Sequence, residues 1–124
     1  MNPENLQYTD THQWARIEDD VAIIGITDYA QEQLGEVVYV DLPQLGDEVT
    51  AGEVMGSVES VKSISDLYSP VSGKIIEVND PLMDEPAKIN TDPYGDAWMV
   101  KIEMSHPSDA DALLSAADYQ AKLD

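Results

Sequence analysis

The chain has 124 residues, of which 25 are acidic and only 6 are basic, so its net charge at pH 7 is −19. Such an acidic surface repels phosphate, which excludes general binding to nucleic acid or to anionic membranes. The absence of cysteine excludes disulfides and thiolate metal sites. Hydrophobic residues make up 43% of the chain, enough for one modest core, and we expect a single domain over residues 1–124. Like charges also disfavour self-association, so we expect a monomer.

The N-terminal segment shows no targeting signal. Residues 1–10 (MNPENLQYTD) lack a basic start, an apolar stretch and an arginine-rich amphipathic pattern. No apolar run elsewhere approaches the roughly 20 residues of a membrane span. We therefore expect a soluble, cytoplasmic protein of bacterial type, or a mitochondrial one if a transit peptide has been removed.

The first half of the chain predicts short strands around one helix. Residues 1–13 look irregular. Alternating apolar residues then indicate three strands, over residues 14–18, 21–26 and 36–42. Thr27 has the position of a helix N-cap and Gly35 that of a C-terminal stop, which predicts a short helix over 28–34. After the third strand, Gly46 is the expected positive-φ residue of a turn.

The second half predicts a β-hairpin followed by a loop-rich region. Two β-branched runs flank residues 61–63, so we expect a hairpin with Val61, Lys62 and Ser63 at its tip. The remaining expectations are a strand over 73–78, a helical turn over 81–83, a turn over 90–95, a last strand over 96–102, and one or two amphipathic helices over 108–122 capped by Ser108 or Asp109.

The stretch around Lys62 is the most informative part of the sequence. Loop tips on rigid scaffolds display functional groups, although lysine is also common there as a solubilising residue. Residues 58–62 read VESVK and residues 65–73 read SDLYSPVSG. Together they strongly resemble the lipoyl-attachment region of the glycine cleavage system H protein family. The segments GITDYAQEQLGEVVYVDLP and DPYGDAWMVKI are further family-like stretches.

The resemblance implies a fold, a cofactor and partners. The fold would be mainly β, a barrel-sandwich hybrid (lipoyl-domain-like) of two small antiparallel sheets, with a short helix near 28–34 and C-terminal helices near 108–122. Lys62 would carry lipoic acid in amide linkage, in a carrier that is not itself an enzyme. That carrier would shuttle an aminomethyl group from the glycine decarboxylase (P protein) to the aminomethyltransferase (T protein). Its dihydrolipoyl arm would go to dihydrolipoyl dehydrogenase (L protein), and a lipoate-attaching enzyme would modify it beforehand.

The resemblance also implies roles around the lysine. Glu59 corresponds to a residue by which the lipoylating enzyme recognises the hairpin, and Gly46 and Gly73 correspond to turn glycines that contribute to this recognition. Each also has a purely structural interpretation: a charged strand residue for Glu59, and turn geometry for the two glycines.

Three other residues correspond to a cleft that shelters the aminomethyl arm, namely Thr11, Gln13 and Asp66. A carboxylate there would hold a protonated amine by a charge-assisted bond. The family usually has glutamate where this chain has Gln13, so that contact would lack its charge. The neighbouring His12 is expected to be structural, bonded to the backbone.

Other classes of protein fit less of the sequence. A biotinyl domain would show Met-Lys-Met, and a lipoyl domain of a 2-oxoacid dehydrogenase would show Asp-Lys and a linker. An H-like interaction module or a lipoate-relay protein remains open.

His12 and His106 lie far apart without ligand-spaced neighbours, so we expect no metal site. The sequence also lacks a nucleophile elbow or a phosphate-binding loop.

Overall fold

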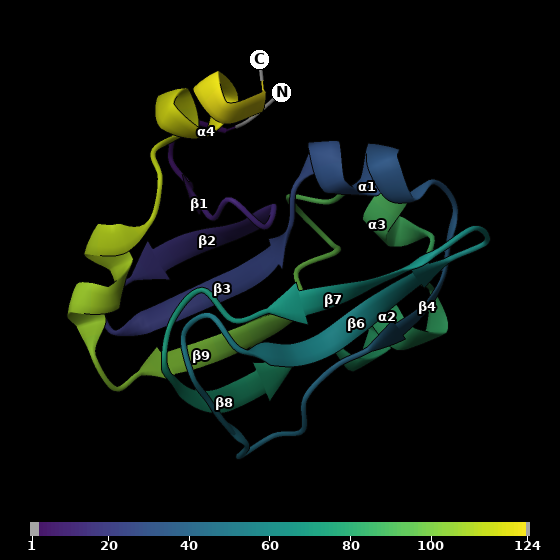
Figure 1. Ribbon diagram of the computed structural model, residues 1–124. Coiled ribbons are helices and arrows are strands. Elements are labelled where there is room, and N and C mark those ends of the chain that lie inside the picture. Colours follow the sequence, from purple (N-terminus) through teal and green to yellow (C-terminus); the bar gives the residue numbers. More distant parts are fainter. Residues whose placement is uncertain (1–2, 124) are drawn as a thin grey trace.

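The computed structural model describes residues 3–123, which form two antiparallel sheets flanked by short helices (Figure 1). Within these residues one sheet has the strand order β1-β2-β3-β9-β8-β5 and the other β4-β6-β7. The strands are β1 (Gln7–Tyr8), β2 (Gln13–Glu18), β3 (Val21–Ile26), β4 (Val37–Asp41), β5 (Glu48–Val49), β6 (Val54–Ser60), β7 (Ile64–Tyr68), β8 (Gly73–Val78) and β9 (Val100–Met104). The helices are α1 (Asp28–Leu34), α2 (Asp80–Asp84), α3 (Lys88–Thr91), the 3-10 helix η1 (Pro107–Ala112) and α4 (Ala116–Leu123).

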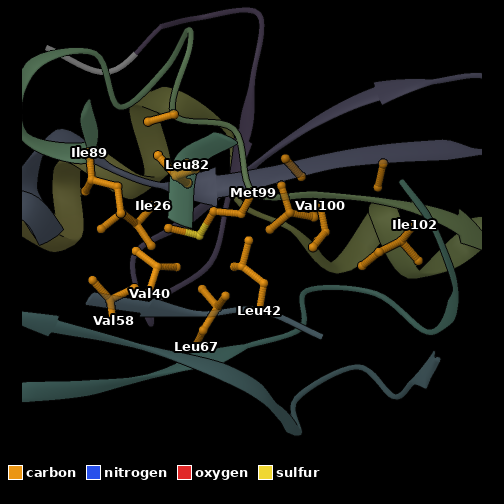
Figure 2. Close-up of a cluster of buried hydrophobic side chains, with 14 of the residues drawn as sticks. Ile26, Val40, Leu42, Val58, Leu67, Leu82, Ile89, Met99, Val100 and Ile102 are labelled. Carbon is orange, nitrogen blue, oxygen red and sulfur yellow. The ribbon is translucent and has the colours of Figure 1, made fainter. Parts of the chain in front are cut away.

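The main hydrophobic core lies between the two sheets (Figure 2). Val40, Val58 and Leu67 come from the smaller sheet, and Val100 and Ile102 from the larger. Side chains alternate between the faces of a strand, so one apolar face of each sheet meets that of the other. The predicted mainly β fold of two antiparallel sheets is therefore confirmed, and the sheets do not close into a barrel.

A second cluster covers the other face of the larger sheet. It contains Tyr8, Trp14, Ile23 and Tyr119, all buried. The rings of Tyr8 and Tyr119 stack with their centroids 4.8 Å apart. Because Tyr119 belongs to α4, this stacking fixes the C-terminal helix on the N-terminal strand. None of the helices in residues 3–123 has the length and apolar character needed to cross a membrane.

Several predicted elements have the predicted bounds. The strands at 21–26 and 73–78 and the helix at 28–34 are found as β3, β8 and α1. Thr27 caps α1, because its hydroxyl accepts a hydrogen bond from Ala30 N at 3.2 Å. Gly35 ends the helix with a φ of +80°, and Gly46 has a φ of +91°.

Other predictions about local structure are wrong. Residues 1–13 are not irregular throughout, since β1 pairs with β2 and Gln13 already belongs to β2. The predicted turn at 90–95 begins inside α3 instead. The last strand starts only at Val100, because the chain before it is held in turns, with Asp96 N donating to Asp92 Oδ2 at 2.8 Å.

The C-terminal caps and Gly73 also differ from expectation. Neither Ser108 nor Asp109 caps η1, whose N-cap is His106 without a side-chain bond. The Asp109 carboxylate instead accepts a hydrogen bond from Ser72 N at 3.0 Å. Gly73 is not a turn residue but the first residue of β8, where a Cβ would lie only 2.1 Å from the carbonyl oxygen of Glu103. The approach of β9 requires glycine there.

Candidate functional site

Lys62 lies in the turn of the β6–β7 hairpin, as predicted. Strand β6 ends at Ser60 and β7 begins at Ile64, which leaves residues 61–63 to form the turn. Ser60 closes it, since its N–H donates to Ser63 O at 2.8 Å. Its hydroxyl oxygen accepts from Lys62 N at 3.3 Å and from Ser63 N at 3.1 Å. The tip that displays the lysine is therefore an ordered turn.

The Lys62 side chain is exposed, and none of residues 3–123 forms an ion pair with its ammonium group. The end of the side chain passes over Gly35, where a Cβ would lie 3.5 Å from its Cε. The tip is tied to the same corner by the bond from Val61 N to Glu36 O, 3.0 Å long. In Figure 1 the hairpin tip projects on the side where α1 and α3 lie. The amine is thus held at a defined place and is free to react.

Asn90, which the sequence did not single out, holds this corner together. Its Oδ1 accepts a hydrogen bond from Val37 N at 2.9 Å. Its Nδ2 donates to Gly35 O at 2.7 Å and to Gln31 Oε1 at 3.0 Å. One side chain on α3 thereby supplies hydrogen-bond partners for backbone groups at the end of α1 and at the start of β4. No local pattern signals such a role, because Asn90 and Val37 are 53 residues apart in sequence.

A cleft of about 380 Å³ opens beside the hairpin. Five parts of the chain line it: residues 11–13 at the start of β2, the end of β3, helix α1, strand β6, and β7 with the preceding turn. Thr11, Gln13 and Asp66, which come from distant parts of the sequence, all line it. Ser63 lines it as well, next to Lys62 in the chain. Its volume is at the small end of the range for ligand sites, roughly 300–1,000 Å³.

The Gln13 amide is already engaged by its own segment. Its Oε1 accepts hydrogen bonds from the hydroxyls of Thr9, at 2.9 Å, and of Thr11. Its Nε2 donates to Thr11 O at 2.9 Å. An amide oxygen has two acceptor positions, and both are filled here. Gln13 therefore cannot accept a bond from an amine in the cleft unless a threonine hydroxyl turns away.

Asp66 differs from Gln13 in this respect. It lies on β7, exposed, opposite Ser57 of β6. Within the described part of the chain, no side chain or N–H bonds to its carboxylate or pairs with it. Of the three predicted cleft residues, Asp66 is the one with an ionisable acceptor free for a ligand.

Among residues 3–123 the ring of His12 bonds to a side chain and not to the backbone, which corrects the prediction. Its Nδ1 lies 2.7 Å from the hydroxyl of Tyr119, and its ring packs against Tyr29 with centroids 4.7 Å apart. Burial lowers the pKa of His12, partly opposed by the nearby Asp10 carboxylate. His106 lies elsewhere, exposed at the start of η1. No group of three or more metal-ligating side chains gathers anywhere in residues 3–123.

The residues predicted for lipoylation recognition are not all close to Lys62. Glu59 lies on β6 in the hairpin itself, opposite Tyr39 and Ile64. Gly46 instead bonds through its N–H to Ile75 O at 2.8 Å, and Gly73 pairs with Val49 and Met104 in the other sheet. Only Glu59 shares the hairpin with the lysine.

An exposed lysine on an ordered hairpin tip beside a cleft is the arrangement of a carrier domain whose lysine bears a covalent group. Comparison with known proteins agrees. The sequence profile of the family described as "Glycine cleavage H-protein" matches residues 6–124. This match covers nearly the whole chain, and the chain belongs to the glycine cleavage H-protein family.

Individual relatives are similar over almost their full length. The glycine cleavage system H protein of Anaeromyxobacter sp. (strain K) is 56% identical over 119 residues, which cover 96% of this chain and 93% of that protein. The H protein of Carboxydothermus hydrogenoformans is 48% identical over 122 residues, 98% of this chain and 94% of that one. The crystal structure of the H protein from Mycobacterium marinum superposes with a TM-score of 0.91, at 41% identity and 98% coverage of both chains.

Family membership establishes the function class. H proteins are non-catalytic lipoyl carriers of the glycine cleavage system, so the chain carries lipoic acid on a lysine and is not an enzyme. Its partners are the glycine decarboxylase, the aminomethyltransferase, dihydrolipoyl dehydrogenase and the enzyme that attaches lipoate. The alternatives of a biotinyl domain or a 2-oxoacid dehydrogenase domain are therefore set aside.

Proposed function

We propose that Lys62 is the residue that carries the lipoyl group, and that the chain works as one carrier domain. The observation that supports this most is the exposed, unpaired ammonium of Lys62 on an ordered tip beside a cleft. Forming an amide removes the charge of the lysine. Because no described carboxylate pairs with Lys62, acylation leaves no carboxylate without its partner.

The site fits such a group. When attached, a lipoyl group supplies a cyclic disulfide on a long flexible arm, able to take up and release an aminomethyl group. The protein keeps that reactive end at high local concentration near its partners. The cleft beside Ser63 gives the end a place to rest away from bulk water.

Within the cleft we assign the amine contact to Asp66. Its free carboxylate can accept a charge-assisted hydrogen bond from a protonated amine, whereas the Gln13 oxygen is occupied by Thr9 and Thr11. Thr11 and Gln13 then shape the cleft wall as one bonded unit. The family usually has glutamate where this chain has Gln13, and that glutamate would add a second negative charge to the cleft. In this chain the electrostatic contact with the amine is made by Asp66.

Glu59 is the residue we assign to recognition by the lipoate-attaching enzyme, because it is half-buried in the hairpin three residues before Lys62. Gly46 and Gly73 support the strands of the larger sheet and act on recognition only through the fold. We place the protein in the bacterial cytoplasm, in keeping with its bacterial relatives.

Intact-mass analysis of protein from its native host tests the attachment site. We expect a lipoyl mass increment that peptide mapping places on Lys62 and that is absent in Lys62→Arg. Lys74→Arg, which changes another exposed lysine, on β8, should keep the increment. A lipoyl group that persists in Lys62→Arg, or one lost in Lys74→Arg, would overturn the assignment.

The role of Asp66 is tested on lipoylated protein loaded with the aminomethyl group. Asp66→Asn should release ammonia roughly 10- to 150-fold faster, since a hydrogen bond to a charged group is worth roughly 1.5–3 kcal/mol. Asp41→Asn is the matched control, because Asp41 is exposed and faces the same residue, Ser57, from β4. Equal release rates in the two variants would refute the contact.

A further inference from the structure

Three side chains form a hydrogen-bonded row behind the cleft. The Thr27 hydroxyl lies 2.8 Å from that of Tyr119, which in turn lies 2.7 Å from Nδ1 of His12. Thr27 caps α1, Tyr119 belongs to α4 and His12 precedes β2. Thr27 and Tyr119 are completely buried. The row therefore links the C-terminal helix to the wall of the cleft.

Counting protons fixes the direction of these bonds. The Thr27 oxygen already accepts from Ala30 N, and the only acceptor near its proton among the described residues is the oxygen of Tyr119. Tyr119 then has one proton to donate, and it goes to Nδ1 of His12. The reverse direction leaves the buried Thr27 proton without an acceptor, at a cost of about 1–3 kcal/mol.

The same count places the proton of His12. An imidazole whose Nδ1 accepts a hydrogen bond is neutral and carries its proton on Nε2. Nε2 has no hydrogen-bond partner among the described residues. It is also not one of their buried unpaired atoms, so it is accessible from outside. His12 lines the cleft together with Tyr29 and Asp66. The N–H of Nε2 is thus a donor available to a ligand, while Nδ1 of the same ring is bonded to Tyr119 in the interior.

We propose that His12 is a positioning residue that offers this fixed Nε2–H donor to the sulfur end of the group resting in the cleft, with Tyr119 of α4 setting its tautomer. The proposal rests on the function proposed above. Asp66 and His12 would then contact different atoms, since a carboxylate accepts from an ammonium while an Nε2–H donates to an electron-rich sulfur. With a donor on His12 and an acceptor on Asp66, the cleft would fix the orientation of the bound group as well as its position.

The tautomer can be tested without any lipoyl group. Two-bond ¹H–¹⁵N correlation spectra of the unlipoylated protein, at a pH where imidazole is neutral, distinguish the protonated from the bare ring nitrogen. The chain has two histidines, so the His106→Gln variant leaves the His12 signals alone. We expect a single tautomer with the proton on Nε2, whereas exposed His106 in the wild type shows an average.

Tyr119→Phe tests the origin of this tautomer. Loss of the hydroxyl should give His12 an averaged signal, while Thr27→Ser, which keeps a hydroxyl, should leave it unchanged. If Tyr119→Phe proves too unstable to measure, the wild-type spectrum still decides. A proton on Nδ1, or a folded Tyr119→Phe with an unaltered His12 signal, would overturn the proposal.

The effect on the cleft needs the lipoylated, loaded protein. His12→Leu should release ammonia about 2- to 10-fold faster, the range expected for one hydrogen bond. His12→Gln, whose amide can donate from nearly the position of Nε2, should restore much of the loss. Unchanged release in His12→Leu would refute the positioning role and leave the carrier function intact. Failure of the carrier function itself would instead appear as absence of lipoate from Lys62.

Discussion

Gly46 and Gly73 show how one residue type can meet two different demands. Gly46 has a φ of +91° and nothing within 4 Å of the position of a Cβ, so only its backbone conformation calls for glycine. Gly73 has no positive φ, but the Glu103 oxygen lies 2.1 Å from the position of its Cβ. The first is a matter of torsional preference and the second of hard contact with another strand.

Alanine at these two positions should therefore destabilise the fold unequally. Gly46→Ala should lower the free energy of unfolding by about 1 kcal/mol, the cost of a left-handed conformation with a side chain. Gly73→Ala should lower it by about 3 kcal/mol, since backbone must move. Urea denaturation measures both, and the rate of lipoylation in vitro shows whether either glycine is recognised directly. Equal destabilisation would contradict the steric argument.

At the scale of elements, the α1–β4 corner supports the functional hairpin. Lys62 extends over Gly35, and Val61 is bonded to Glu36, so the tip rests on this corner. Asn90 of α3 supplies the hydrogen bonds that keep the corner closed. A short helix that lies 26 or more residues after Lys62 in the sequence thereby helps to determine where the lysine sits.

Replacing Asn90 should open this corner. Asn90→Ala leaves Val37 N–H and Gly35 C=O without their partners, each at a cost of about 1–3 kcal/mol, so we expect a loss of about 2 kcal/mol or more. Lipoylation should slow as well, because the tip loses its support. Thr91, the residue after Asn90, provides the control, because Thr91→Ala removes only a long 3.4 Å bond to Lys88 O. Equal denaturation midpoints for the two variants would exclude this role.

At the scale of the whole molecule, charge governs association more than folding. The ion pairs Arg16–Glu18, Lys88–Asp96 and Lys101–Glu77 involve partly exposed side chains. Such pairs contribute roughly 0–1 kcal/mol. With a net charge of −19, the surface repels its own copies and would attract a basic face on a partner. This suits a carrier that must dock and leave repeatedly.

Stability should be constant in a middle pH range and fall on either side. Burial, with a smaller contribution from neighbouring tyrosines, raises the pKa of Tyr8, and burial raises that of Tyr119. Burial raises the pKa of Tyr94 to about 12. Their stabilisation is complete below the unfolded value of 10.0 and is lost as pH rises from there towards the folded values. His12 acts in the opposite direction: with its pKa lowered, its contribution is complete above 6.5 and is lost as pH falls.

Urea denaturation across pH measures both limbs. Tyr119→Phe should flatten the alkaline loss and His12→Gln the acid one, because each removes one of the titrating groups. Because Tyr119 is hydrogen-bonded to His12, each variant can also shift the other limb, so each limb is compared with that of the wild-type protein. An alkaline limb unchanged in Tyr119→Phe, together with an acid limb unchanged in His12→Gln, would contradict the assignment of these groups.

The sequence by itself determined what depends on neighbouring residues. Strands at 21–26 and 73–78 follow from alternation, and the helix at 28–34 follows from its cap at Thr27 and its stop at Gly35, because these signals lie within a few residues of the structure they specify. The hairpin with Lys62 at its tip was readable for the same reason.

Only the tertiary structure decided which distant residues meet. Asn90 closes the α1–β4 corner across 53 residues, and Tyr119 reaches His12 across 107. The start of β9 and the true reason for Gly73 were likewise hidden, because both depend on how strands far apart in the chain approach each other. Each residue type determines how many hydrogen bonds it can donate and accept, but the packing of the chain determines which partners make them.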